Sequence, residues 1–185
     1  MMLKPKKIPE IVVLVEGENE QKYWDAIRFL GKTKKFNLWQ ATEAKIKSLL
    51  RTIKVSSQIV VIADTDQLQE INNFIHNISS LKKHCKLAPI VILQCENFED
   101  ELCYSCNCKI SHLYSHFGAT GIDNLKSNIN KEKHLIKKLE KIKHNSSLMW
   151  SRSGKNSQKS FDDIKNLIGN HDTLIDKGIR VDFNS

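Results

Sequence analysis

Residues 11–17 read Ile-Val-Val-Leu-Val-Glu-Gly, and residues 59–66 read Ile-Val-Val-Ile-Ala-Asp-Thr-Asp. Each stretch is a run of apolar, mostly β-branched residues that ends in one or two acidic side chains. Such runs are typical of strands that are covered on both faces of a parallel sheet. Both stretches therefore predict central strands, and both place carboxylates at the carboxyl end of a strand.

Helical patterns follow these strands. Apolar residues fall on one stripe between residues 18 and 30, at i, i+3, i+4 and i+7 within residues 46–53, and again along residues 68–81. The four expected strands are residues 11–15, 36–39, 59–63 and 90–93. Alternation of this kind predicts an α/β, Rossmann-like fold in which helices flank a mainly parallel four-stranded sheet.

The remainder of the chain has a different pattern. Its expected elements are helices at residues 96–108, 131–143 and 160–168, with a polar loop at residues 145–160. A chain of 185 residues is long enough for one well-buried core. We therefore expect a core at residues 1–105 and a helical C-terminal extension at residues 106–185 that packs on it.

Composition and charge favour a protein that is neither membrane-spanning nor secreted. The longest apolar runs are strand-sized, so no membrane span is expected, and the N-terminus lacks the apolar region and cleavage site of a signal peptide. We expect a cytoplasmic protein whose five cysteines are reduced. The net charge of +8 suits a nucleic-acid partner, although a solvated basic face is an equally ordinary explanation.

The acidic residues at the two strand ends predict a metal site. Since parallel strands carry their carboxyl ends to the same edge of a sheet, Glu16 should lie close to Asp64 and Asp66. Alternation along an extended chain lets Asp64 and Asp66 point to one side, where carboxylate oxygens suit Mg²⁺. The alternative is structural: an acid at the start of a helix can act as an N-cap without any metal.

The same residues carry a family resemblance. Glu16-Gly17-Glu18-Asn19-Glu20 after a first strand, followed by Asp64-Thr65-Asp66 after a later one, resembles the Toprim domain of topoisomerases, bacterial primases, small ribonucleases and overcoming-lysogenization-defect nucleases. The resemblance spans residues 10–105, and the size is most similar to small Toprim proteins of phage-defence systems. It implies a Toprim fold.

The resemblance also implies roles for single residues. Glu16 matches the general acid or base, Asp64 and Asp66 match the metal-binding pair, and Glu20 matches a second acidic position of nucleases. In nuclease members an acidic cluster beyond the fourth strand can help to hold a second metal. The residues of that region here are Glu96, Glu99, Asp100 and Glu101. The sequence does not show which of them faces inward, and we take Glu99 as the candidate ligand. The implied cofactor is Mg²⁺, for which Mn²⁺ can substitute.

Three hypotheses for function follow. The first is a Mg²⁺-dependent phosphodiesterase that cleaves DNA or RNA as a defence-system effector, alongside the ATPase partner that small relatives have. The second is a non-catalytic module that keeps the Toprim fold and binds nucleic acid or a partner protein. The third is a phosphotransfer or nucleotide-handling enzyme. The additional domains that topoisomerases and primases need are absent from this layout, which favours a nuclease over either.

Two other groups of residues could bind ligands. Cys103, Cys106 and Cys108 precede a histidine pair, but one helix-borne group cannot easily surround a zinc ion, so we expect reduced thiols and no zinc. In the polar loop, basic side chains could contact phosphates while an indole stacks on a base. The candidate nucleic-acid-binding residues are Trp150, Arg152, Lys155 and Lys159. A partly buried tryptophan with solvated basic neighbours is the structural alternative.

Overall fold

The computed structural model describes residues 9–27, 29–152 and 160–179. Within these ranges a five-stranded sheet has the order β2-β1-β3-β4-β5, and all neighbouring strands are parallel. The strands are β1 (Ile11–Val15), β2 (Lys32–Lys35), β3 (Gln58–Ala63), β4 (Ile90–Leu93) and β5 (Ile168–Gly169). The predicted α/β class and parallel sheet are confirmed, and the arrangement is compatible with a Rossmann-like fold. The predicted number of four strands is wrong.

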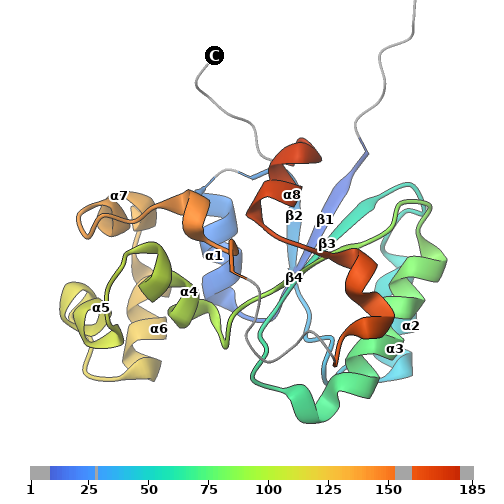
Figure 1. Ribbon diagram of the computed structural model, residues 1–185, viewed down its shortest axis with the longest axis horizontal. Helices are drawn as coiled ribbons and strands as arrows, with labels where there is room; N and C mark the ends of the chain where they lie inside the picture. The colour runs from blue at the N-terminus through green and yellow to red at the C-terminus, as the bar shows by residue number, and fades with distance from the viewer. Residues whose placement is uncertain (1–8, 28, 153–159, 180–185) are drawn as a thin grey trace, which may run out of the picture.

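Helices cover both faces of the sheet (Figure 1). On one face lie α1 (Glu18–Ala26), α4 (Phe98–Ser105) and α8 (His171–Asp176). Beyond α1 and α4, and packed on them, lie α5 (Ile110–Phe117), α6 (Ile122–Lys131) and α7 (Leu135–Glu140). The other face packs against α2 (Glu43–Arg51), α3 (Ile71–His84) and the 3₁₀-helix η3 (Asp162–Leu167). No helix in the described ranges is long and apolar enough to cross a membrane.

The apolar strand sequences reflect this double cover. In β1, Val13 and Val15 pack into one hydrophobic core while Val12 and Leu14 pack into the other. Successive side chains of a strand point to opposite faces, so a strand covered on both sides needs apolar residues at every position. The unbroken apolar runs therefore correctly predicted β1 and β3.

The strand predicted at residues 36–39 is wrong. The second strand is instead β2, whose sequence is Lys-Thr-Lys-Lys and which lies at the edge of the sheet beside β1. An edge strand pairs on one side only and commonly carries lysines, so an apolar pattern cannot reveal it. Immediately after it, the Phe36 N–H still donates to the Val15 oxygen at 2.7 Å.

The C-terminal part also differs from the prediction. The helix expected at residues 96–108 is the shorter α4, and the helix expected at residues 131–143 begins only at Leu135, as α7. In place of the expected last helix, η3 leads directly into β5, which pairs with β4. The extension is therefore not purely helical, because it supplies the fifth strand of the core sheet.

Residues 36–41 cross the end of the sheet without regular structure and are fastened by two asparagines of α3. The Asn77 side chain, which is 1% exposed, donates through Nδ2 to the oxygens of Leu38 and Ala41, at 2.8 and 3.0 Å. The Asn73 Nδ2 donates to the Trp39 oxygen at 2.5 Å and to the Ala41 oxygen at 3.2 Å. Backbone groups that no strand pairs are thus satisfied by side chains.

Replacing Asn77 with alanine should destabilise the protein by about 1–3 kcal/mol, because the Leu38 carbonyl loses its side-chain donor and the Ala41 carbonyl keeps only that of Asn73. Asn72 of the same helix is exposed, and Asn72→Ala should change the free energy of unfolding by less than about 0.5 kcal/mol. Urea denaturation of both variants measures the difference. Equal stabilities would contradict the role given to Asn77.

Candidate metal centre

The candidate site lies where the strand order of the sheet reverses. After β1 the chain crosses through α1 on one face, and after β3 it crosses through α3 on the opposite face. Since β1 and β3 are neighbours, with Leu14 in register with Val61, the residues that follow both strands come together. Parallel α/β sheets bind ligands at such reversal points. The predicted proximity of Glu16 and Asp64 is thus what the topology produces.

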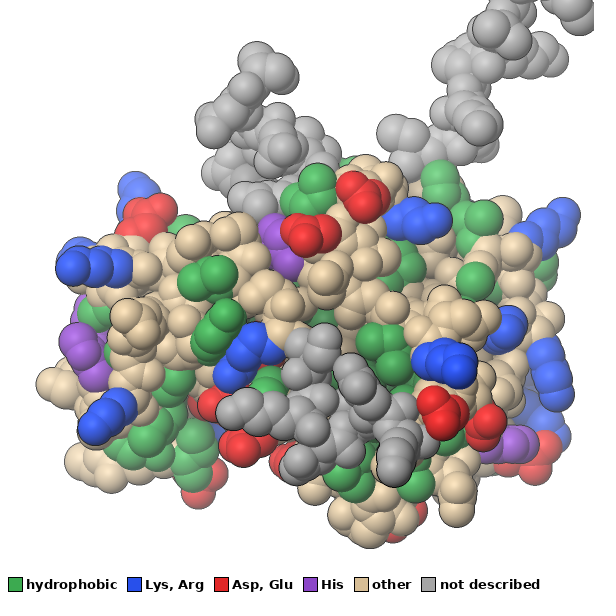
Figure 2. Space-filling model, viewed as in Figure 1, with side chains coloured by type: hydrophobic (Ala, Val, Ile, Leu, Met, Phe, Trp, Pro, Cys, Tyr) green, Lys and Arg blue, Asp and Glu red, His purple; other side chains and the backbone are tan. Residues whose placement is uncertain are grey.

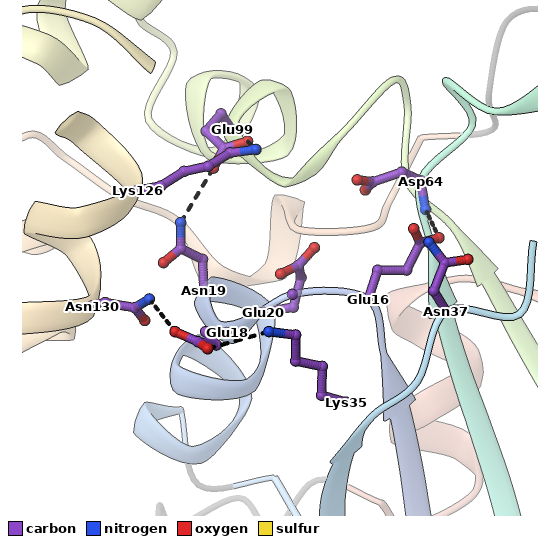
Figure 3. Close-up of a pocket in the computed structure, with 11 residues that line it drawn as sticks. Glu16, Glu18, Asn19, Glu20, Lys35, Asn37, Asp64, Glu99, Lys126 and Asn130 are labelled. Atoms are coloured by element: carbon purple, nitrogen blue, oxygen red, sulfur yellow. Dashed lines mark hydrogen bonds and ion pairs between the residues drawn. The ribbon is translucent and has the colours of Figure 1, made fainter. Parts of the chain in front are cut away.

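A cavity of about 420 Å³ opens at this point. Its walls come from the end of β1, the start of α1, the segments after β2 and β3, and helices α4 and α6 (Figure 3). Acidic and amide side chains dominate the lining, which consists of Glu16, Gly17, Glu18, Asn19, Glu20, Lys35, Asn37, Asp64, Glu99, Lys126 and Asn130.

Glu16 is held by three donors from two segments, the stretch after β2 and the stretch after β3. Its Oε1 accepts from the Trp39 indole at 2.8 Å and from the Asp64 backbone N–H at 3.0 Å, and its Oε2 accepts from the Gln67 amide at 3.3 Å. Burial raises the pKa of Glu16 to about 7, although the hydrogen bonds from Asp64 and Trp39 oppose this rise. The carboxyl group is therefore fixed in place and able to exchange a proton near neutral pH.

Asp64 faces the same cavity from the end of β3. Burial raises the pKa of Asp64 to about 9, and the nearby charges of Glu20 and Glu16 add to the effect. The Gln94 amide donates to the Asp64 Oδ1 at 2.5 Å. Like charges gathered in a poorly solvated cavity repel one another, and a bound cation would relieve that repulsion.

Glu20 completes the group of three carboxyls. It is 5% exposed, and burial together with the charge of Glu99 raises the pKa of Glu20. Its side chain folds back over Gly17, where a Cβ atom would lie 2.5 Å from the Glu20 Oε2. Gly17 is therefore needed for the position of a neighbouring carboxylate, since any larger residue would displace it.

The acids beyond β4 have separate roles. Glu99 is 3% exposed and lines the cavity, where its Oε1 accepts from Asn19 at 3.3 Å and its Oε2 lies 3.9 Å from the Lys126 Nζ. Glu101, 0% exposed, instead accepts the backbone N–H groups of Cys95 and Trp150. Of the acidic cluster that the sequence could not resolve, Glu99 is the member beside the other carboxyls.

Asp66 occupies a different position from the one expected. It is exposed and does not line the cavity, yet its charge raises the pKa values of Glu16 and Asp64. The chain turns into η1 (Leu68–Glu70) just beyond it, so residues 64–66 do not continue as a strand. Asp64 and Asp66 are consequently close in space without sharing the cavity.

Several polar residues at the cavity were not found by sequence reasoning. Lys35 donates to Glu18 at 3.2 Å, and Asn130 of α6 donates to the other oxygen of Glu18 at 3.0 Å. Lys126 and Asn130 lie more than 100 positions after Glu18, and only the packing of α6 on α1 brings them here. Gln94 had a detectable signal, because it directly follows a predicted parallel strand.

The predicted nucleic-acid-binding group is not assembled as expected. Trp150 is 1% exposed and donates from its indole to the Gln94 Oε1 at 3.1 Å, so its ring has no free face for stacking on a base. Arg152 pairs with Asp100 at 2.6 Å and with Glu101 at 3.2 Å. The prediction that Trp150 stacks on a base is thus wrong, since its ring is buried in the core. Lys155 and Lys159 lie outside the described residues.

The cysteines are all free thiols, and Cys103, Cys106 and Cys108 lie near one another. Burial raises the pKa of Cys103 to about 12 and that of Cys106 to about 11, which disfavours the thiolates that a metal requires. Across residues 9–27, 29–152 and 160–179, no three His, Cys, Asp or Glu side chains are arranged to hold a metal ion by themselves.

No family model, curated protein sequence or solved structure matches this chain. The geometry of the cavity is therefore the basis for any functional proposal.

The raised pKa values of the cavity make stability depend on pH. Because the pKa of Asp64 in the folded protein lies above that of an exposed aspartate, its contribution to stability is full below about pH 4 and is lost as the pH rises through about 9. We expect Asp64→Asn to gain stability relative to the unaltered protein between about pH 5 and pH 9. Urea denaturation with a chelator present measures this gain, and a difference that is constant with pH would contradict it.

Proposed function

We propose that this chain is a cytoplasmic, Mg²⁺-dependent nuclease of the Toprim type. The observation that carries the proposal is the convergence of Glu16, Glu20 and Asp64, with raised pKa values, on one cavity at the reversal point of a parallel sheet. Burying carboxyls together without neutralising them is unfavourable for folding alone. A cation bound in the cavity would offset this cost, because it would neutralise the charge of the carboxylates.

The donor set fits a hard cation. All the candidate ligands in the cavity are oxygens, and the Asn19 Oδ1 is a buried acceptor that has no hydrogen-bond partner among the described residues. Mg²⁺ is usually held by one or two carboxylates together with waters and substrate phosphates, so it does not need three protein ligands in place. Glu16, Glu20 and Asp64 would hold the ion, with Asp66 and Glu99 at its margins, and Mn²⁺ could substitute.

The bound ion would neutralise a phosphate and lower the pKa of an attacking water. The chain itself supplies the remaining functions. Glu16, held by three hydrogen bonds and with a pKa of about 7, can accept a proton and return it as a general base and acid. Lys35 and Lys126 at the cavity can contact phosphate oxygens once the nearby acids bind metal.

The substrate class follows from charge and cavity chemistry. The net charge of +8 favours a polyanion, either DNA or RNA. Figure 2 shows Lys and Arg side chains spread toward both ends of the face that it presents, interspersed with Asp and Glu side chains. A role as a defence effector with an ATPase partner rests on the Toprim resemblance.

A non-catalytic binding module is the second candidate. It is favoured by the exposed position of Asp66 outside the cavity and by the lack of any three-ligand metal group in the described residues. In that case the carboxyls would bind a cation weakly, and nucleic acid or a partner protein would bind without being cleaved.

Cleavage assays separate the two candidates. With Mg²⁺ or Mn²⁺, we expect cleavage of at least one substrate from a panel of single- and double-stranded DNA and structured RNA. Glu16→Gln and the Asp64→Asn/Asp66→Asn double variant should each lose about 100-fold or more of the activity, because proton transfer or metal binding is removed. Gel analysis of the products, with circular dichroism to check folding, measures the effect.

Asp123→Asn is a matched control, because Asp123 is an exposed first-turn acid of α6 that does not line the cavity. Its activity should equal that of the unaltered protein. Full activity in folded Glu16→Gln would contradict the nuclease proposal. Cation binding without cleavage of any substrate would favour the binding module.

A further inference from the structure

Gln94 joins two of the carboxyl groups of the cavity. It is 0% exposed and follows β4 directly, so its side chain projects from the same sheet edge as Asp64. Its Nε2 donates to the Asp64 Oδ1 at 2.5 Å, and the same side-chain amide also lowers the pKa of Glu20. The Gln94 amide thus holds Asp64 directly and lies close enough to Glu20 to affect its pKa.

Trp150 determines which way the Gln94 amide points. The indole Nε1 donates to the Gln94 Oε1 at 3.1 Å. An indole N–H can only donate, so it requires the carbonyl end of the amide, while the NH₂ end must then face Asp64. The two ends of an amide have nearly the same shape, and only such partners distinguish them.

Trp150 is itself fixed by the core. Its ring packs against Trp24 and Tyr23, with ring centroids 5.8 Å apart in both pairs. Its backbone, at a φ of +59°, donates to the Glu101 Oε2 at 3.0 Å, and Glu101 also accepts from the Cys95 N–H at 2.9 Å. A residue of the C-terminal extension is therefore held rigidly behind the cavity.

We propose that Gln94 is a positioning residue for Asp64 and that Trp150 sets its orientation, so that the C-terminal extension controls the affinity of the cavity for a divalent cation. This inference rests on the proposed metal site. Hydrogen bonds to ligand side chains orient them for the ion, and their loss commonly weakens metal binding by about 10- to 100-fold.

Two tryptophans of one cluster provide the test. Trp150→Phe removes the donor to Gln94, whereas Trp24→Phe removes an indole N–H that has no hydrogen-bond partner among the described residues. Both rings are fully buried and pack against each other, so the loss of volume is the same. In calorimetric titrations with Mn²⁺, Trp150→Phe should weaken binding about tenfold or more, and Trp24→Phe, which keeps the donor to Gln94, should weaken it much less.

Gln94→Met tests the relay, that is, the chain of hydrogen bonds from Trp150 through Gln94 to Asp64, by a second route. Methionine keeps the length of the side chain and lacks the donor. This variant should weaken Mn²⁺ binding as Trp150→Phe does, and the double variant should bind no more weakly than Gln94→Met alone. Equal weakening by Trp24→Phe and Trp150→Phe, or additive losses in the double variant, would overturn the proposal. Thermal melts by circular dichroism check the folding of each variant.

A separate measurement, which needs no metal, tests this proposal independently of the metal site on which it rests. If the unaltered protein binds no Mn²⁺, the proposed function fails, and the relay is then decided by NMR of the Trp150 indole proton. That proton should exchange with solvent more quickly and shift in Gln94→Met. An indole signal that does not change would overturn the relay, whatever the outcome for metal binding.

Discussion

The candidate site depends on one hydrogen bond between the ends of the neighbouring strands β1 and β3, from the Asp64 backbone N–H to the Glu16 carboxylate at 3.0 Å. From these strand ends the crossover helices leave for opposite faces of the sheet. The bond closes the two ends together and aims both acids at one cavity. Trp39, after β2, and Gln67, after β3, then fix the other sides of Glu16, and Gln40 joins the same two segments by donating to Gln67 at 3.2 Å.

The carboxyl groups of the cavity lower the stability of the fold, because they are buried close to one another. Glu16, Glu20 and Asp64 all have pKa values raised by burial, and the surrounding donors only partly offset that burial. Elsewhere in the same fold, a buried acid is treated differently: Glu101 accepts two backbone N–H groups and pairs with Arg152. Burial nevertheless raises the pKa of Glu101 as well. The cavity differs because its carboxyls are close neighbours: the charge of Glu20 raises the pKa values of both Glu16 and Asp64, as expected of a site that binds a cation.

The sequence predicted what depends on local pattern and failed where distant packing decides. Unbroken apolar runs identified β1 and β3. Because parallel strands end at the same edge of a sheet, the sequence alone also predicted that Glu16 and Asp64 lie close together. The edge strand β2 carries lysines, and β5 has only two residues, so neither has a readable pattern. For Trp150 the sequence left two alternatives, a ring that stacks on a base and a partly buried ring, because nothing local shows that Gln94 and Glu101 accept its two N–H groups.

The number of protons released on metal binding tests directly whether the protonated carboxyls of the cavity are the ligands. With pKa values of about 9 and about 7, Asp64 is protonated at pH 7 and Glu16 about half protonated. Calorimetric titration with Mn²⁺ at pH 7, in buffers of different ionisation enthalpy, gives the number of protons released per ion. We predict more than one, and the number released per bound ion should fall by about one in Asp64→Asn. Binding heats that are identical in all buffers, or no binding, would contradict a metal site built from these carboxyls.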